Sequence, residues 1–176
     1  MRIGIVGAGA IGGFLGLRLS QVTAVKLVHR PGRPPKLDGI AAPTVEGEIV
    51  RPTRALRPAD DPAATADCQV VLVATKSAAT EDVARSLSEV LPPDVPVVSM
   101  QNGLRNADRL RAHLGPRAVG GVVGYNVFRD DHGHLVQATS GDLFAGTLDG
   151  IPGARLRRLA ALMRQAGERL VLRPDI

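Results

Sequence analysis

The chain has 176 residues, 44% hydrophobic and 22% charged, so it is long enough for one domain with its own hydrophobic core. Only 2% of the residues are aromatic, and the core must therefore be aliphatic, as in a parallel sheet buried on both faces. The formal charge of +5 comes mostly from scattered arginines, and with so few aromatic rings to stack on bases we expect no nucleic-acid partner.

Cys68 is the only cysteine, which excludes a disulfide within the chain, and the spacing of His and Cys matches no metal motif. The strand pattern begins at residue 2, and no apolar run approaches the length of a membrane span. We therefore expect a cytoplasmic chain that binds no metal and no membrane.

The first thirteen residues predict a strand, a tight turn and the start of a helix. The apolar run 3–6 is followed by Gly7, Gly9 and Gly12, which have the G-x-G-x-x-G spacing of a dinucleotide-binding turn. Gly7 would let the chain reverse tightly, and Gly9 would leave room for a pyrophosphate against the backbone. Gly12 would let the helix pack closely on the strand.

A glycine-rich stretch can also be a plain turn, but its context here favours the dinucleotide interpretation. A helical pattern over 14–19 and a second aliphatic run over 24–28 complete the βαβ unit that such a turn requires. The N–H groups of Ala10 and Ile11, at the start of the helix, would then point at the phosphates.

The end of the second predicted strand indicates which dinucleotide is bound. NAD-binding turns place Asp or Glu about 20 residues beyond the glycines, where the carboxylate binds the ribose hydroxyls. This chain has Arg30 and Arg33 there and no acidic residue. A guanidinium can bind a 2′-phosphate through two hydrogen bonds, which favours NADP(H) over NAD(H). The alternative is that both arginines are solvated loop charges.

The next segment, residues 31–62, is rich in proline and poor in helix signals. We expect an irregular excursion with short extended pieces at 39–41 and 48–50, in place of a regular crossover helix.

Residues 67–75 form the clearest buried strand pattern of the chain, and Lys76 follows it directly. Ser77 is predicted to cap the helix that comes next. Ligands of parallel α/β sheets bind outside the carboxyl ends of the strands, so Lys76 is either a phosphate or ribose contact or a solvated loop charge.

A further strand over 95–98 carries the sequence 101–103 to the same edge of the sheet, before another helix. Asn102 is either a turn asparagine beside a glycine or a residue facing the nicotinamide end of a dinucleotide.

The last third of the chain predicts strands at 118–128, 135–138 and 143–145, then a helix opened by Pro152 and a short strand at 170–172. A metal site at the turn 130–134 is not expected, because neighbours in a hairpin tip rarely converge on one ion. The fold class predicted for the whole chain is α/β, a Rossmann-type doubly wound parallel sheet with an antiparallel hairpin extension.

Taken together, these motifs resemble the ketopantoate reductase (2-dehydropantoate 2-reductase) family. The resemblance covers essentially the whole chain and is carried by residues 7–12, Arg30, Lys76 after Thr75, the sequence Gln101-Asn102-Gly103, and the segments 124–127 and 134–146.

The resemblance implies that residues 1–176 are the NADP-binding domain of an enzyme that reduces a small 2-oxo acid, ketopantoate, with NADPH, on the route to pantothenate and coenzyme A. Arg30 and Lys76 would contact the 2′-phosphate and adenosine side. Asn102 would lie near the nicotinamide ribose and the substrate, with Asn126 a weaker candidate nearby.

The chain departs from the family at its end. The general-acid lysine and the substrate-binding glutamate of the family belong to a carboxyl-terminal helical domain, which would begin just after Ile176. Neither Lys26 nor Lys36 is placed to substitute for that lysine. We therefore expect no catalytic residue in this chain, and binding of NADP(H) with slow turnover or none.

The same departure leads us to expect an uncovered apolar surface near the last helix and strand, through which the chain could form a homo-oligomer. Two alternative functions remain open: a reductase of the same architecture for another oxo acid, and a non-catalytic NADP(H)-binding module.

Overall fold

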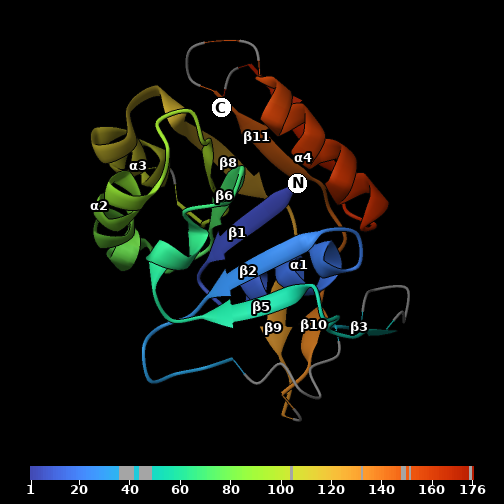
Figure 1. The fold of residues 1–176 in the computed structure, drawn as a ribbon. Helices are drawn as coiled ribbons and strands as arrows, with labels where there is room; N and C mark the ends of the chain where they lie inside the picture. Colours follow the sequence, from blue (N-terminus) through green and yellow to red (C-terminus); the bar gives the residue numbers. More distant parts are fainter. Residues whose placement is uncertain are drawn as a thin grey trace.

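The computed structural model describes residues 1–35, 42–43, 49–103, 105–131, 133–147, 150, 152–174 and 176. Its centre is an eight-stranded sheet with the strand order β12-β11-β8-β7-β6-β1-β2-β5 (Figure 1). The strands of this sheet are β1 (Arg2–Val6), β2 (Ala24–Val28), β5 (Leu56–Ala59), β6 (Val70–Val73), β7 (Val97–Ser99), β8 (Ala118–Val123), β11 (Leu143–Gly146) and β12 (Leu170–Arg173). From β5 to β8 all neighbours are parallel, whereas β11 is antiparallel to β8 and parallel to β12.

Helices cover both faces of the sheet (Figure 1). They are α1 (Ala10–Ser20), α2 (Thr80–Val90), α3 (Asn106–Leu114) and α4 (Ala154–Gln165), with short 3-10 turns η1 (Pro62–Thr65), η2 (Ser77–Ala79) and η3 (Gly115–Arg117). One buried cluster joins α1 and α4 to Ile3, Ile5 and Leu72, and a second joins α2 and α3 to Val71 and Val73. Alternate strand residues thus point to opposite faces, and the predicted doubly wound Rossmann-type fold is confirmed.

The predicted antiparallel extension is also confirmed, but it is divided between two sheets. The strand predicted over 118–128 is broken: β8 ends at Val123, and β9 (Val127–Arg129) pairs with β10 (Leu135–Gln137) in a separate two-stranded sheet. Close packing at Gly124 accompanies the break. Its N–H donates to the carbonyl of Asp142, and a Cβ there would lie 2.4 Å from that oxygen.

The proline-rich excursion contains more regular structure than its sequence indicates. Two short strands, β3 (Ala42–Pro43) and β4 (Ile49–Val50), pair with each other, while the piece expected at 39–41 lies outside the described residues. The strand β5 was not predicted. It contains Pro58, which a sheet tolerates at an edge strand, and β5 pairs with β2 at the edge of the main sheet.

A buried polar cluster connects α1 to the segment that precedes β12. Arg18 in α1 and Glu168 before β12 are 7% and 5% exposed, with Nε 3.3 Å from Oε1. The Tyr125 hydroxyl donates to Glu168 Oε2 at 3.0 Å. Burial, reinforced by the Glu168 charge, raises the pKa of Tyr125 above its usual range, so the phenol stays neutral.

Two large apolar side chains of the described residues are about half exposed, Val122 in β8 at 49% and Phe128 in β9 at 50%. They lie on strands other than the last helix and strand, where we expected uncovered apolar surface. Among the described residues no helix combines the length and the apolar character needed to cross a bilayer.

Candidate functional site

The turn between β1 and α1 has a different steric demand at each of its three glycines. Gly7 has φ +111°, and a Cβ there would lie 2.6 Å from the Ala74 carbonyl carbon. A Cβ on Gly12 would lie 1.8 Å from the Gly7 oxygen. Gly9 differs from both, because a Cβ there would meet no atom within 4 Å. The fold therefore requires glycine at positions 7 and 12, while Gly9 faces open space where a ligand can approach the backbone.

The amino terminus of α1 opens into the same space. Gly9 is its N-cap and provides no side-chain cap, and the first turn carries no acidic residue. The first intrahelical hydrogen bond runs from Gly13 N to Gly9 O at 2.8 Å. The N–H groups of Ala10 and Ile11 therefore precede the helical ladder, and they lie at the positive end of the helix dipole, where an anion is favoured.

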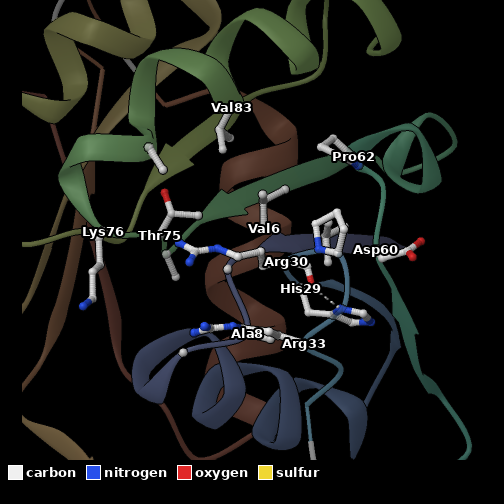
Figure 2. A pocket seen from close by; sticks show the side chains of 16 residues that line it. Val6, Ala8, His29, Arg30, Arg33, Asp60, Pro62, Thr75, Lys76 and Val83 are labelled. Atoms are coloured by element: carbon white, nitrogen blue, oxygen red, sulfur yellow. Dashed lines mark hydrogen bonds between the residues drawn. The ribbon is translucent and has the colours of Figure 1, made fainter.

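A cavity of about 540 Å³ lies beside this turn, at the carboxyl ends of β1, β2, β5 and β6. Gly7 to Gly9 form one wall, and Thr75 and Lys76, after β6, form another. Figure 2 shows the loop after β2 contributing His29, Arg30 and Arg33. The cavity is therefore the crevice at the strand ends in which open α/β sheets bind ligands.

The charges around the cavity are mainly positive. Arg30, Arg33 and Lys76 all belong to its wall and are exposed, and Asp60 is its one carboxylate among the described residues. In Figure 2 the Arg30 side chain extends across the cavity from the β2 end towards the β6 end. Three cations against one anion suit a ligand with several phosphate charges.

Of the predicted site residues, the cavity brings together Gly7, Gly9, Arg30 and Lys76. Ala10, Ile11 and Gly12 lie behind Gly9 in the first turn of α1. Two further candidates, Asn102 and Asn126, are exposed in the loops after β7 and β8 and lie outside the cavity wall.

The two asparagines differ in how their loops are held. The Asn102 carbonyl accepts hydrogen bonds from Ser77 Oγ at 3.1 Å and Asn106 Nδ2 at 2.8 Å. The backbone of Asn126 pairs with Thr139 Oγ1 and with the N–H of Ala138. The first loop is thus tied to the β6 end of the cavity, and the second to the β9–β10 hairpin.

Ser77 is not the helix cap that its sequence predicts. It begins η2, and α2 starts at Thr80 with Ala79 as its N-cap and no side-chain cap. The Ser77 hydroxyl donates instead to the Asn102 carbonyl.

Sequence reasoning missed several residues of the wall. Asp60 and Pro62 follow β5, which was not predicted as a strand because its segment is rich in proline. Ala79 and Val83 lie at the start of α2. Their place in the chain could have indicated Asp60 and Pro62, because residues that follow a parallel strand beside β2 lie at the same edge of the sheet as the cavity. Ala79 and Val83 add apolar surface to the cavity wall.

Within the part of the chain that the structure describes, no three His, Cys, Asp or Glu side chains come together to hold a metal ion. His134 of the predicted turn instead pairs with Asp130, with Nδ1 3.2 Å from Oδ2.

Comparison with known proteins agrees with this fold. The family model for ketopantoate reductase PanE/ApbA matches residues 3–150. The 2-dehydropantoate 2-reductase of Archaeoglobus fulgidus is 30% identical over 99% of this chain and 57% of its own length. That of Halobacterium salinarum is 31% identical over 95% of this chain and 56% of its own. A crystal structure of a PanE/ApbA family ketopantoate reductase from Ralstonia eutropha superposes with a TM-score of 0.84 at 27% identity, covering all of this chain and 57% of that one.

The sheet order, the glycine turn and the crevice beside it define a Rossmann-type α/β protein. Within that class, the chain belongs to the ketopantoate reductase PanE/ApbA family, a family of oxidoreductases. It spans a little over half the length of the curated relatives it matches.

Proposed function

We propose that residues 1–176 form the NADP(H)-binding domain of an NADPH-dependent 2-dehydropantoate 2-reductase, which reduces ketopantoate to pantoate. The observation that carries the proposal is the open face of Gly9 at the uncapped start of α1, beside a cavity with three cationic side chains. When bound there, NADPH would supply the hydride for the 2-oxo group.

Each part of the site has a proposed role. The N–H groups of Ala10 and Ile11 bind the pyrophosphate, which Gly9 lets approach the backbone. Arg30 binds the 2′-phosphate, Arg33 adds a second guanidinium, and Lys76 contacts the phosphate or ribose of the adenosine half.

The loops after β7 and β8 are proposed to serve the reacting end. Asn102 lies near the nicotinamide ribose and the oxo acid, and Asn126 is the weaker candidate beside it. Both are exposed polar side chains on loops that follow parallel strands, where they are free to meet a ligand.

The proton donor that hydride transfer to a ketone requires is proposed to lie in the helical region of the family, outside these residues. General acid catalysis is worth about 10²–10⁴-fold, so the domain alone should reduce ketopantoate slowly or not at all. Lys26 does not substitute, because its Nζ lies 3.0 Å from Asp67 Oδ1, and Asp67 precedes β6, at the opposite end from the cavity. A rate close to that of an ordinary reductase would contradict this part of the proposal.

Isothermal titration calorimetry with NADPH and NADH tests the cofactor assignment. We expect NADPH to bind at least about tenfold more tightly, since charge-assisted hydrogen bonds to a phosphate contribute about 1.5–3 kcal/mol. Arg30→Ala should weaken NADPH binding about tenfold and leave NADH binding nearly unchanged. Arg158→Ala, which removes an exposed arginine on α4, is the matched control. Equal affinities for the two dinucleotides, or no binding of either, would refute the assignment.

Self-association through an apolar surface near the last helix and strand stays a prediction, although the two half-exposed large apolar side chains among the described residues, Val122 and Phe128, lie on β8 and β9. Sedimentation velocity tests it, and a monomer at every concentration would refute it.

A further inference from the structure

A buried polar network joins the loops that follow β6 and β7. Its members Thr80, Gln101 and Asn106 are 0%, 5% and 2% exposed, although all three are polar. Thr80 begins α2 and Asn106 begins α3, while Gln101 lies in the loop after β7, which ends at Ser99. Buried polar side chains are retained in a fold only where hydrogen bonds satisfy them, so the arrangement of these three is tightly specified.

Gln101 is the link to the cavity wall. Its Nε2 lies 3.0 Å from the Thr75 carbonyl oxygen and 3.2 Å from Thr75 Oγ1, and Thr75 is a wall residue. The same Nε2 donates to Thr80 Oγ1 at 2.8 Å, while Gln101 Oε1 accepts from Ser99 Oγ at 3.3 Å. The end of β7 is thereby held against the end of β6.

Asn106 is the link to the Asn102 loop. The Thr80 hydroxyl donates to Asn106 Oδ1 at 3.3 Å, and Asn106 Nδ2 donates to the carbonyl of Asn102 at 2.8 Å. That Nδ2 also lies 3.1 Å from Ser77 Oγ, which itself donates to the same carbonyl. Gly103 has φ +114°, and a Cβ there would lie 3.3 Å from Asn106 Nδ2, so the loop closes tightly over the network.

We propose that Gln101, Thr80 and Asn106 are positioning residues that fix the Asn102 loop against the Thr75–Lys76 loop, and so set the affinity for the nicotinamide half of a bound dinucleotide. None of the three belongs to the cavity wall. Gln101 acts through Thr75 and Asn106 through the Asn102 carbonyl, while Thr80 links Gln101 to Asn106. The inference rests on the proposed dinucleotide function.

Thr80→Val is the sharpest test, because it keeps the shape of the side chain and removes only the hydroxyl shared by Gln101 and Asn106. We expect NADPH binding to weaken about tenfold, since one hydroxyl carries two buried hydrogen bonds. Binding of adenosine 2′,5′-bisphosphate should change less than about twofold, because the proposed function places that fragment against Arg30 and Lys76, and Asn102 lies outside the cavity wall. Thr80→Ser should restore NADPH affinity, and Ser88→Ala, on the exposed face of α2, is the hydroxyl-loss control.

Equal weakening of NADPH and of the bisphosphate would show a general loss of fold and overturn the inference, as would unchanged NADPH binding. Hydrogen exchange of the unliganded chain tests the coupling without any ligand. In Thr80→Val the amides of 101–103 should exchange faster while those of β1 and β6 do not, and unchanged exchange in that loop would also overturn it. If the unaltered chain bound no dinucleotide, the proposed function would fail first, whereas normal binding with an unaffected Thr80→Val would count against the network alone.

Discussion

Alanine substitutions at Gly12 and Gly9 should separate what the fold requires from what the ligand requires. A Cβ on Gly12 would lie 1.8 Å from the Gly7 oxygen, far inside the roughly 3.5 Å at which nonbonded heavy atoms pack. Both the oxygen and the first turn of α1 are backbone, so no side chain can rotate away. Overpacking typically costs about 1–3 kcal/mol, and this position should lie at the upper end.

Gly9→Ala has the opposite expectation. Gly9 has φ −75°, and a Cβ there meets nothing within 4 Å, so alanine should cost at most about 1 kcal/mol as a poorer N-cap. Its methyl group would stand where the pyrophosphate approaches, and NADPH binding should fall by more than about tenfold.

Thermal unfolding followed by circular dichroism measures the stability difference. For a chain of this size 1 kcal/mol corresponds to about 2–4 °C, so Gly12→Ala should lower Tm by roughly 6–12 °C and Gly9→Ala by no more than about 4 °C. An unchanged Tm for Gly12→Ala would refute the steric reasoning. Undiminished NADPH binding by Gly9→Ala would refute the role of the open backbone.

Three further substitutions or reactions test other parts of the fold. Tyr125→Phe removes one buried hydrogen bond to Glu168 and should cost about 1–2 kcal/mol in urea unfolding; no change would mean that the bond contributes nothing. Cys68 is 3% exposed and burial raises its pKa to about 11, so at pH 8 the folded chain should react with a thiol reagent far more slowly than the unfolded chain. Lys26, with Arg2, holds the pKa of Asp67 below its usual range, which stabilises the fold above about pH 4 and is lost as the pH falls through the lowered pKa. Asp67→Asn should therefore weaken the acid dependence of stability below about pH 4, and an unchanged profile would contradict that.

The sequence predicted best what depends on local pattern. The aliphatic runs 3–6 and 70–73 need burial on both faces, and the glycines between strand and helix leave few other conformations. These features suffice for the fold class and for the turn that frames the cavity. The roles assigned to Arg30, Lys76 and Asn102 stay predictions, because position at a strand end does not specify what a side chain binds.

The sequence predicted poorly what depends on a partner far along the chain. Ser77 has the residue type of a helix cap, yet its hydroxyl donates a hydrogen bond to the carbonyl of Asn102, 25 residues along the chain. Likewise β5 becomes a strand only because β2 offers it an edge, despite Pro58. Local sequence propensity predicts neither the Ser77 hydrogen bond nor the β5 strand, because both depend on contacts with residues far along the chain.

The cavity combines two kinds of recognition, and this explains the uneven success of sequence reasoning. The wall proposed to face the phosphates is backbone, so its glycines can be recognised in the sequence, and it would suit NAD(H) as well as NADP(H). Its other walls are side chains from separate strand ends, among them Arg30 and Lys76, and the proposed preference for a 2′-phosphate depends on how far apart those ends are held. That spacing is a property of the sheet register, with β1 between β2 and β6, rather than of any one loop. The Thr80, Gln101 and Asn106 network is proposed to act instead on the Asn102 loop, so a substitution there should alter binding of the nicotinamide half without touching the ligand, whereas one in the glycine turn should act on the ligand directly.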